Sequence, residues 1–227
     1  MSDTGDSRHD TRQRVLESAV EAFAAEGFRD ATVHEICEGA EANIAAVNYY
    51  FGSKENLYVE AWRKAFHDSV EAHPPDGGVP PDAPPGERLR GRIRALIRRA
   101  ADERASDFAI VHKELANPTG LLEEVMRECL EPLHEQILAL VRELLGPGVG
   151  EQQGRFCLVS IFSQCHGPII RRRLQGDRLH GGGPGPLKPG ETDAYADHVV
   201  AFTLAGIRAV RRRAAHGRPA GHKGRAK

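Results

Sequence analysis

The run TVHEICEGAEANIAAVNYYFGSKENL, which begins at Thr32, restricts the possible fold more than any other part of the chain. Start and stop signals for helices divide it into short pieces. Thr32 is a good N-cap for a short helix, and Gly39 is a typical residue at which such a helix ends. Asn43 can then cap a second helix over residues 44–51. The pattern predicts two short helices joined by a tight turn.

The end of the second helix is also marked in the sequence. Gly52 can adopt the left-handed conformation that ends a helix, and Ser53 can cap a third helix that begins at Lys54. Two short helices joined by a tight turn are typical of the helix-turn-helix, a DNA-reading motif whose second helix enters the major groove. We therefore expect residues 44–51 to contact double-stranded DNA.

The run NYYFGSKENLY, which begins at Asn48, resembles the signature of the TetR family of one-component transcriptional repressors. The preceding NIAAVNYYF resembles a subset of that family, the CecR-like regulators, and the match covers residues 11–62. The resemblance implies an all-α fold, with an N-terminal three-helix DNA-binding domain and a C-terminal helical domain for effector binding and dimerisation. It also implies a homodimer that binds a palindromic operator and is released by a small-molecule effector.

Composition excludes several other classes of protein. The chain of 227 residues has a net charge of −1, no run of 18 apolar residues and a polar start, MSDTGDSRHD, that is unlike a signal peptide. Its four cysteines lack the CxxC spacing of a metal site. No phosphate loop, metal-ligand set or paired-carboxylate motif supports a helical enzyme. We therefore expect a cytoplasmic protein that is not an enzyme and has no membrane partner, metal or cofactor.

Periodicity and helix-breaking residues divide the chain into segments. Residues 1–10 are expected to be a disordered arm, 11–55 the DNA-binding domain, 56–215 the effector and dimerisation domain, and 216–227 a basic disordered tail. The Pro- and Gly-rich run 74–86 is predicted to be a surface linker. The expected helices cover residues 11–26, 33–39, 44–51, 54–72, 87–104, 106–116, 120–145, 151–174 and 192–215.

Residues 1–72 hold 7 basic and 14 acidic residues, a local charge of −7. Phosphate contact requires cations, so an acidic DNA-binding domain is unusual. Either the few cations gather on the DNA face with the acids behind them, or the affinity is modest and strongly salt-dependent. The sequence leaves both interpretations open.

The period of the second helix separates core from DNA-facing positions. Val47 and Phe51 are four residues apart and should face the core, as should Ile36 and Ala40 of the first helix. Asn48 is the best candidate for base readout, because an amide can form two hydrogen bonds with adenine. The resemblance implies that Thr32, Tyr49, Tyr50 and Lys54 contact the DNA backbone, although packing is an alternative role for each tyrosine. The candidate DNA-binding residues are Thr32, Asn43, Ile44, Ala45, Ala46, Asn48, Tyr49, Tyr50 and Lys54.

One residue of the motif departs from the family pattern. The family commonly has glycine in the turn where this chain has Glu41. A carboxylate at this place repels phosphate unless it points away, so the geometry of the turn is left open.

The last two helices carry apolar residues on more than one face, which fits either a deeply buried helix pair or a second partner. The resemblance favours a dimer interface built from these helices. The candidate interface residues are Phe156, Val159, Phe162, Ile170, Val199, Phe202, Gly206 and Val210.

The resemblance implies an effector pocket enclosed by the helices between residues 87 and 174. Polar residues that interrupt the apolar pattern there, with nearby aromatic and Met side chains, are candidates for its wall. A lone histidine is more often a surface or core residue than a ligand-binding one, so this alternative is kept for each. The candidate effector-binding residues are Phe108, His112, Asn117, Met126, Phe162, Gln164 and His166, with Glu114 as a further polar candidate.

Two alternative functions remain at this point. One is a helix-turn-helix regulator without a small-molecule effector. The other is a helical dimer that does not bind DNA, which would leave the motif between Thr32 and Leu57 without a role.

Overall fold

The computed structural model describes the backbone of residues 3–175 and 190–216, and the side chains of 9–167 and 190–216. All regular structure in these ranges is helical, as predicted. In the same ranges, no helix combines the length and the apolar character that crossing a membrane requires. The helices are α1 (Asp3–Ala25), α2 (Val33–Gly39), α3 (Ala45–Phe51), α4 (Lys54–Ala72), α5 (Pro85–Ala101), α6 (Ser106–Ala116), α7 (Glu123–Leu145), α8 (Glu151–Gln175) and α9 (Thr192–His216).

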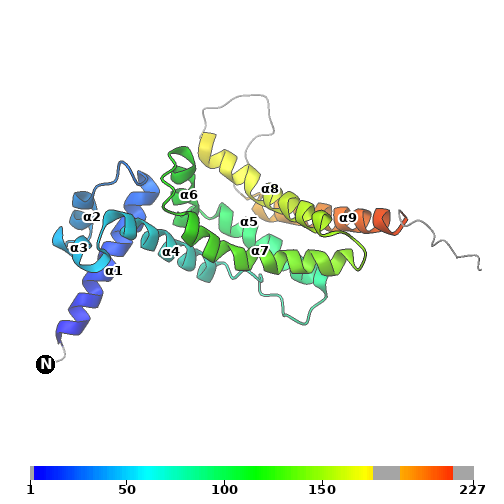
Figure 1. Cartoon of the computed structure of the whole chain (residues 1–227), viewed down its shortest axis with the longest axis horizontal. Coiled ribbons are helices and arrows are strands. Elements are labelled where there is room, and N and C mark those ends of the chain that lie inside the picture. Colours follow the sequence, from blue (N-terminus) through cyan, green and yellow to red (C-terminus); the bar gives the residue numbers. More distant parts are fainter. Residues whose placement is uncertain (1–2, 176–189, 217–227) are drawn as a thin grey trace, which may run out of the picture.

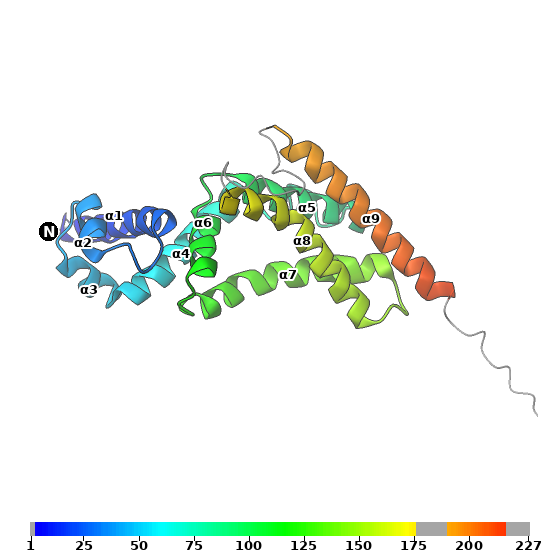
Figure 2. The same cartoon turned by 90° about the horizontal axis from the view of Figure 1, so that it is seen from above.

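The helices form a small unit and a larger one that are joined through α4. Helices α1, α2 and α3 gather at one end of the molecule, and α4 leads from them toward α5 to α9 (Figure 1). Helix α4 packs against α1 and α3 at its start and against α5, α6 and α7 further along. Helix α9 lies along the outer edge of the larger unit (Figure 2). Any movement of α4 therefore moves part of both units.

Two apolar cores support this arrangement. The first joins α1 to α4 with α6 and the start of α7, and includes Phe23, Val47 and Ile110, each at most 1% exposed. The second joins α5, α7, α8 and α9 around residues such as Ile93 and Val141. Helix α6 thus packs against α1 and α4 in the same core as the helix-turn-helix, although the sequence assigned it to the C-terminal domain. The boundary predicted after residue 55 is therefore not a break in packing.

Most predicted helix limits agree with the structure to within a few residues, and the largest difference is at the N-terminus. Helix α1 begins at Asp3, so the predicted disordered arm is wrong for residues 3–10. An ion pair one turn apart, between Asp10 and Arg14 at 3.3 Å, supports this extension. The predicted tail is helical at His216, and residues 217–227 lie outside the described part of the chain.

The run 74–86 is more closely packed than its composition suggested. The backbone around Gly77 lies directly against Gly91 of α5, and a side-chain carbon at either glycine would collide with the backbone of the other segment. Gly77 also has a φ of 64°, which glycine adopts without strain. These two glycines allow the first half of the run to lie on α5.

Candidate DNA-binding surface and ligand cavity

The start of α2 is fixed by a capping box. The Thr32 hydroxyl accepts a hydrogen bond from the Glu35 amide at 3.2 Å, and the Glu35 carboxylate accepts one from the Thr32 amide at 2.9 Å. The Thr32 hydroxyl also donates to that carboxylate, and these bonds lower the pKa of Glu35. The predicted N-cap is thus confirmed, and the Thr32 hydroxyl is oriented by its own helix.

The turn between α2 and α3 contains a backbone that is unusual for its residue. Glu41 has a φ of 49°, the one positive φ at a non-glycine residue in the described part of the chain. An L-residue in this conformation is strained by roughly 1–2 kcal/mol. Its side chain is exposed. Glu41 therefore preserves the turn that glycine provides in the family, at some cost in stability.

Helix α3 presents one face to the core and another to solvent. Val47 and Phe51 are buried, as are Ile36 and Ala40 of α2, as predicted. The N-cap of α3 is Ile44, one residue after the predicted Asn43, and the Asn43 side-chain oxygen accepts a hydrogen bond from the Ala45 amide at 2.9 Å. The candidate DNA-contacting positions are otherwise exposed or half-buried. Exposed are Ile44, Ala45, Asn48 and Tyr49, and half-buried are Ala46 and Tyr50.

The two tyrosines have different environments. Tyr49 is 70% exposed, whereas Tyr50 packs against the first core, and their rings meet edge to face at 4.8 Å. The phenol of Tyr49 is therefore accessible from outside, while the ring of Tyr50 also has a packing role.

Aromatic rings hold two cations near α3. The Lys54 Nζ lies 4.7 Å from the centre of the Phe28 ring, and the Arg12 guanidinium lies 5.0 Å from that of Phe51. Arg12 also pairs with Glu60 at 3.7 Å. Cation–π contact positions a charge without neutralising it. Arg12 was not among the predicted residues, because its place beside α3 depends on how α1 packs.

A cavity of about 360 Å³ lies in the larger unit, and α4 to α8 all contribute to its wall. Five of the seven predicted effector residues line it: Phe108, His112, Met126, Phe162 and His166. The wall is largely apolar, and its other members include Trp62, Leu96, Leu130, Leu133 and Ile137. The sequence thus located the cavity correctly, with some errors in individual residues.

Three polar candidates lie elsewhere. Asn117 is an exposed residue at the end of α6, and the Gln164 side chain donates back to the Ser160 carbonyl at 3.1 Å on its own helix. Glu114 accepts hydrogen bonds from the Thr119 and Gly120 amides and from the Tyr58 hydroxyl. Asn117 and Glu114 thus serve the end of α6 and the turn after it, Gln164 bonds within α8, and none of the three is part of the cavity wall.

The most unusual group in the wall is a buried arginine. Arg99 is 5% exposed, and its guanidinium lies 5.1 Å and 5.0 Å from the ring centres of Phe66 and Phe108. Its Nη1 is 3.9 Å from the Asp107 carboxylate. Burial lowers the pKa of Arg99, although a guanidinium stays charged at neutral pH. The sequence pattern did not predict the burial of Arg99.

Two histidines in the wall are neutral near pH 7. Burial, with smaller contributions from Arg99 and His134, lowers the pKa of His166 to about 4. Burial also lowers the pKa of His134. Both rings contact Phe162, with centroids 5.6 Å and 4.5 Å away. These histidines therefore act as aromatic wall residues rather than as cations.

Several of the cavity residues that were not predicted from the sequence lie on α5. Arg92, Leu96 and Arg99 follow each other at helical spacing on α5, so they form one stripe that faces the cavity. Trp62 of α4 and His134 of α7 were also missed. The stripe was visible as an alternation of apolar and basic residues, but its burial depends on three other helices.

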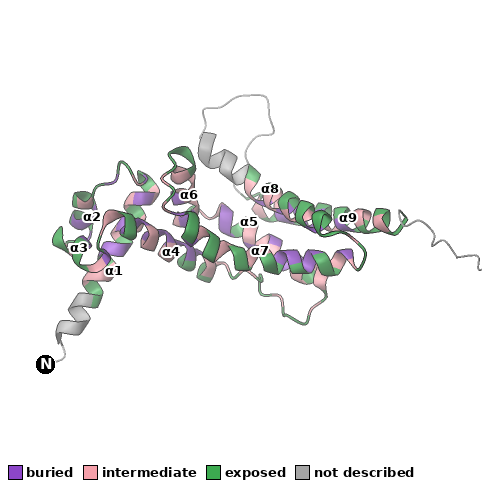
Figure 3. Ribbon diagram, viewed as in Figure 1, coloured by how far each residue is buried: buried purple, intermediate pink, exposed green. Residues whose placement is uncertain are grey.

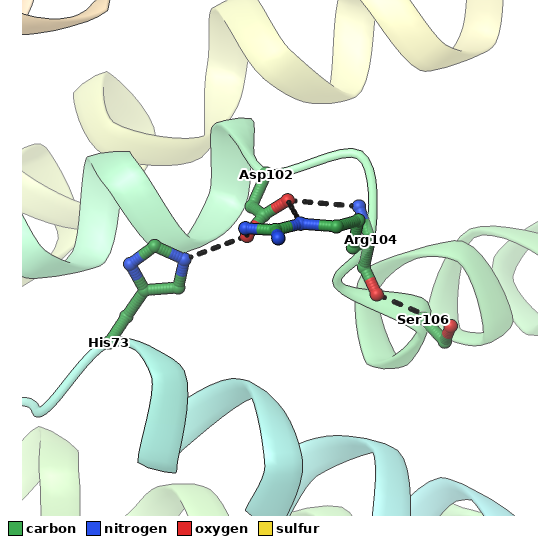
Figure 4. A network of polar contacts seen from close by, with 4 residues as sticks. All are labelled: His73, Asp102, Arg104 and Ser106. Carbon is green, nitrogen blue, oxygen red and sulfur yellow. Dashed lines mark hydrogen bonds and ion pairs between the residues drawn. The ribbon is translucent and has the colours of Figure 1, made fainter.

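A polar network joins the ends of α4, α5 and α6 next to the cavity. His73, which ends α4, lies 2.9 Å from the carboxylate of Asp102, which ends α5 (Figure 4). Arg104 donates to the same carboxylate through its side chain and its amide, and its carbonyl accepts from Ser106 at the start of α6. Hydrogen bonds from Arg104 and then His73 hold the pKa of Asp102 well below its usual range.

Helices α8 and α9 have many exposed residues (Figure 3), and large apolar side chains are among them. Phe156, Val159 and Phe202 are 53%, 63% and 61% exposed, and Gly206 is exposed as well. Val199, in contrast, is fully buried in its own subunit, so its assignment to an interface is wrong. Phe162 lines the cavity, Val210 is half-buried, and the side chain of Ile170 lies outside the described residues.

Two segments of the chain match models of known protein families. Residues 85–207 match the model of the family described as HTH-type transcriptional dual regulator CecR, C-terminal domain. Residues 15–61 match that of bacterial regulatory proteins, tetR family. The chain belongs to the CecR-like group of TetR-family transcriptional regulators.

Individual relatives agree with this assignment. HTH-type transcriptional dual regulator CecR of Shigella flexneri is 30% identical over 60% of this chain, and the alignment spans 65% of that relative. A TetR-like regulator from Rhodococcus sp. RHA1 superimposes with a TM-score of 0.62 at 20% identity, over 87% of this chain and 96% of the other. FadR of Bacillus subtilis, solved in complex with stearoyl-CoA, gives 0.63 at 16% identity, over 86% and 98%. These two structures share its fold.

Proposed function

We propose that this regulator is a repressor that binds a palindromic operator as a homodimer and is released by a small molecule bound in the cavity. One observation carries the proposal. Trp62 of α4 lines the cavity and also belongs to the same apolar core as Val47 of the DNA-reading helix. A ligand against Trp62 therefore touches an element that positions the DNA-binding surface.

The exposed face of α3 supports DNA recognition. Asn48 is the amide best suited to read an adenine edge, while Ile44, Ala45 and Ala46 offer apolar contacts such as those made to a thymine methyl. Thr32, Asn43, Tyr49, Tyr50 and Lys54 surround this face with groups that can bond phosphates. The cations Lys54 and Arg12 both lie on aromatic rings beside it. This supports the interpretation in which a few cations gather at the DNA face of an acidic domain.

The unpaired face of α8 and α9 supports the homodimer. Three large apolar side chains at more than half exposure are expensive to leave in water, and a second copy of the same face would cover them. A twofold dimer would present two α3 helices. Successive major grooves require them to lie about 34–36 Å apart, which explains the palindromic operator.

The cavity supports an effector. Its volume of about 360 Å³ and mostly apolar wall are typical of small-molecule sites. FadR of Bacillus subtilis, which shares the fold, was solved with stearoyl-CoA. A ligand lowers operator affinity only if it binds the DNA-bound conformation less tightly, and such coupling is typically about 1–3 kcal/mol. We expect this coupling to act through α4 and α6, because both helices line the cavity and pack in the first core with the DNA-binding helices.

The decisive experiment starts without knowledge of the operator. Purified protein is incubated with sheared genomic DNA at moderate salt, and the bound fragments are sequenced. We expect a short palindrome, whose two half-sites the dimer protects in a footprint. Lys54→Ala and Asn48→Ala provide matched controls on the same surface. Binding without sequence preference by the ligand-free protein would contradict the proposal.

A further inference from the structure

We infer that the cavity takes a largely apolar small molecule carrying one carboxylate, and that Arg99 and Trp62 hold that carboxylate. This inference rests on the proposed function, because it assigns the chemical class of the effector. It is carried by two buried hydrogen-bond donors without a partner among the described residues, on two residues that both line the cavity.

The first donor is the guanidinium of Arg99. This group lies over the rings of Phe66 and Phe108. Its Nη1 has no hydrogen-bond partner among the described residues, and the 3.9 Å separation from Asp107 is too long for a hydrogen bond. A buried N–H without a partner is unfavourable by about 1–3 kcal/mol, and more when the group is charged. A ligand oxygen would remove this penalty.

The second donor is the indole of Trp62. The residue is 1% exposed, and its Nε1 also lacks a hydrogen-bond partner within the described part of the chain. An indole N–H can only donate. Trp62 on α4 and Arg99 on α5 both line the cavity, so a ligand there lies beside both residues. A group with two acceptor oxygens satisfies both.

The charge of the wall favours an anion. Apart from its histidines, the wall has three charged members among the described residues, Arg92, Arg99 and Asp107, which together carry one net positive charge. Of its four histidines, burial lowers the pKa of His134 and His166, and His73 pairs with Asp102. A carboxylate matches this single charge and the planar fork of an arginine. The remaining wall is dominated by aliphatic and aromatic side chains, so the rest of the ligand must be apolar.

The protein contains one tryptophan, so its fluorescence reports directly on the cavity. We would titrate wild-type protein with decanoate, 1-decanol and decylamine, kept below micelle-forming concentrations, and with 4-phenylbutanoate, 4-phenylbutan-1-ol and 4-phenylbutylamine. Each set keeps the apolar body and changes only the head group. We expect each carboxylate to bind about 10- to 100-fold more tightly than its alcohol, as a charged hydrogen bond predicts, and each amine to bind more weakly still.

Three variants test which residues cause the preference for the acid over the alcohol. Calorimetry is the readout, because Trp62→Phe removes the fluorophore. Arg99→Met should bring the ratio of acid to alcohol affinity close to one, and Trp62→Phe should reduce it several-fold. Arg90→Met, on an exposed position of the same helix, should leave it unchanged. Because Arg99→Met leaves Asp107 buried without its cation, the Arg99→Met/Asp107→Asn double variant is measured beside it. Retained alcohol binding shows that each variant is folded.

Several outcomes would overturn the inference: no binding of either carboxylate, equal binding of acid and alcohol, tighter binding of the amine, or an unchanged acid preference in folded Arg99 variants. Failure of the proposed function looks different. If a carboxylate binds with the expected preference but leaves operator affinity unchanged, the ligand class stands and the effector role fails. If operator binding is specific while no carboxylate binds, the ligand class fails and the DNA-binding role stands.

Discussion

The Nε2 of His73 lies 2.9 Å from an oxygen of Asp102, so a single contact joins the C-terminal end of α4 to that of α5. The side chains are 22% and 15% exposed, whereas Arg104, the other partner of Asp102, is 88% exposed. Water therefore screens the Arg104 contact more strongly, although Arg104 is the larger cause of the lowered pKa of Asp102. Of these two contacts of Asp102, the one with His73 is the one that joins α5 to α4.

We expect His73→Phe and Asp102→Asn each to lower the free energy of unfolding, by about 1–3 kcal/mol, because each breaks a partly buried charge-assisted contact. A double-mutant cycle in urea unfolding should give a coupling energy of about 0.5–2 kcal/mol between the two residues. Arg104→Ala is the control and should change the free energy by less than about 1 kcal/mol. Additive effects of His73→Phe and Asp102→Asn would show that the contact does not join the helices energetically.

The buried histidine of the cavity predicts a pH dependence of stability. His166 has a pKa of about 4 in the folded protein, against about 6.5 in an unfolded chain. Between these values the unfolded state binds more protons, so stability is full above about pH 6.5 and falls as pH decreases toward 4. The largest loss from this group is on the order of 3 kcal/mol.

Urea unfolding between pH 7 and 4.5 measures this dependence. His166→Phe should flatten the profile, since no imidazole remains to be protonated at that position. His198→Phe is a suitable control, because His198 is exposed on α9. An equally steep profile in His166→Phe would assign the pH dependence to other groups.

Lys54 should contribute to operator affinity as a phosphate contact. We expect Lys54→Ala to weaken binding to all DNA sequences similarly and to reduce the slope of log affinity against log salt by about one unit. Lys64→Ala, whose ammonium pairs with Asp68 at 2.7 Å further along α4, should have a much smaller effect. A loss restricted to certain sequences would contradict a backbone role for Lys54.

Asn48 is expected to read a base rather than a phosphate. Asn48→Ala should relax the preference at one position in each half-site by about 1–3 kcal/mol while leaving the salt dependence unchanged. Selection of bound sequences from a randomised operator measures both quantities. An unchanged preference at every position would remove Asn48 from base readout.

The helix ends of the helix-turn-helix could be predicted from the sequence, whereas the burial of residues in the cavity wall could not. Helix ends between Thr32 and Lys54 depend on neighbours a few residues away, so capping rules predicted them within about one residue. The burial of Arg99 instead depends on Phe66, Phe108 and Asp107, which come from two other helices. Residues that contact each other across the fold leave no such local pattern. For the same reason, helical spacing alone could not separate the buried Val199 from the exposed Phe202.

The difference in exposure between Phe202 and Val199 on α9 gives a test of the proposed dimer. Phe202 is 61% exposed, so Phe202→Asp should leave the subunit folded but place a charge at the centre of an apolar interface. We expect monomers by light scattering and a large loss of operator affinity, because a monomer contacts only one half-site. Leu115→Asp, at a comparably exposed apolar residue of α6, should remain dimeric. Val199→Asp should instead unfold the larger unit, because it buries a charge in the second core. A dimer that persists in Phe202→Asp would place the interface on another face.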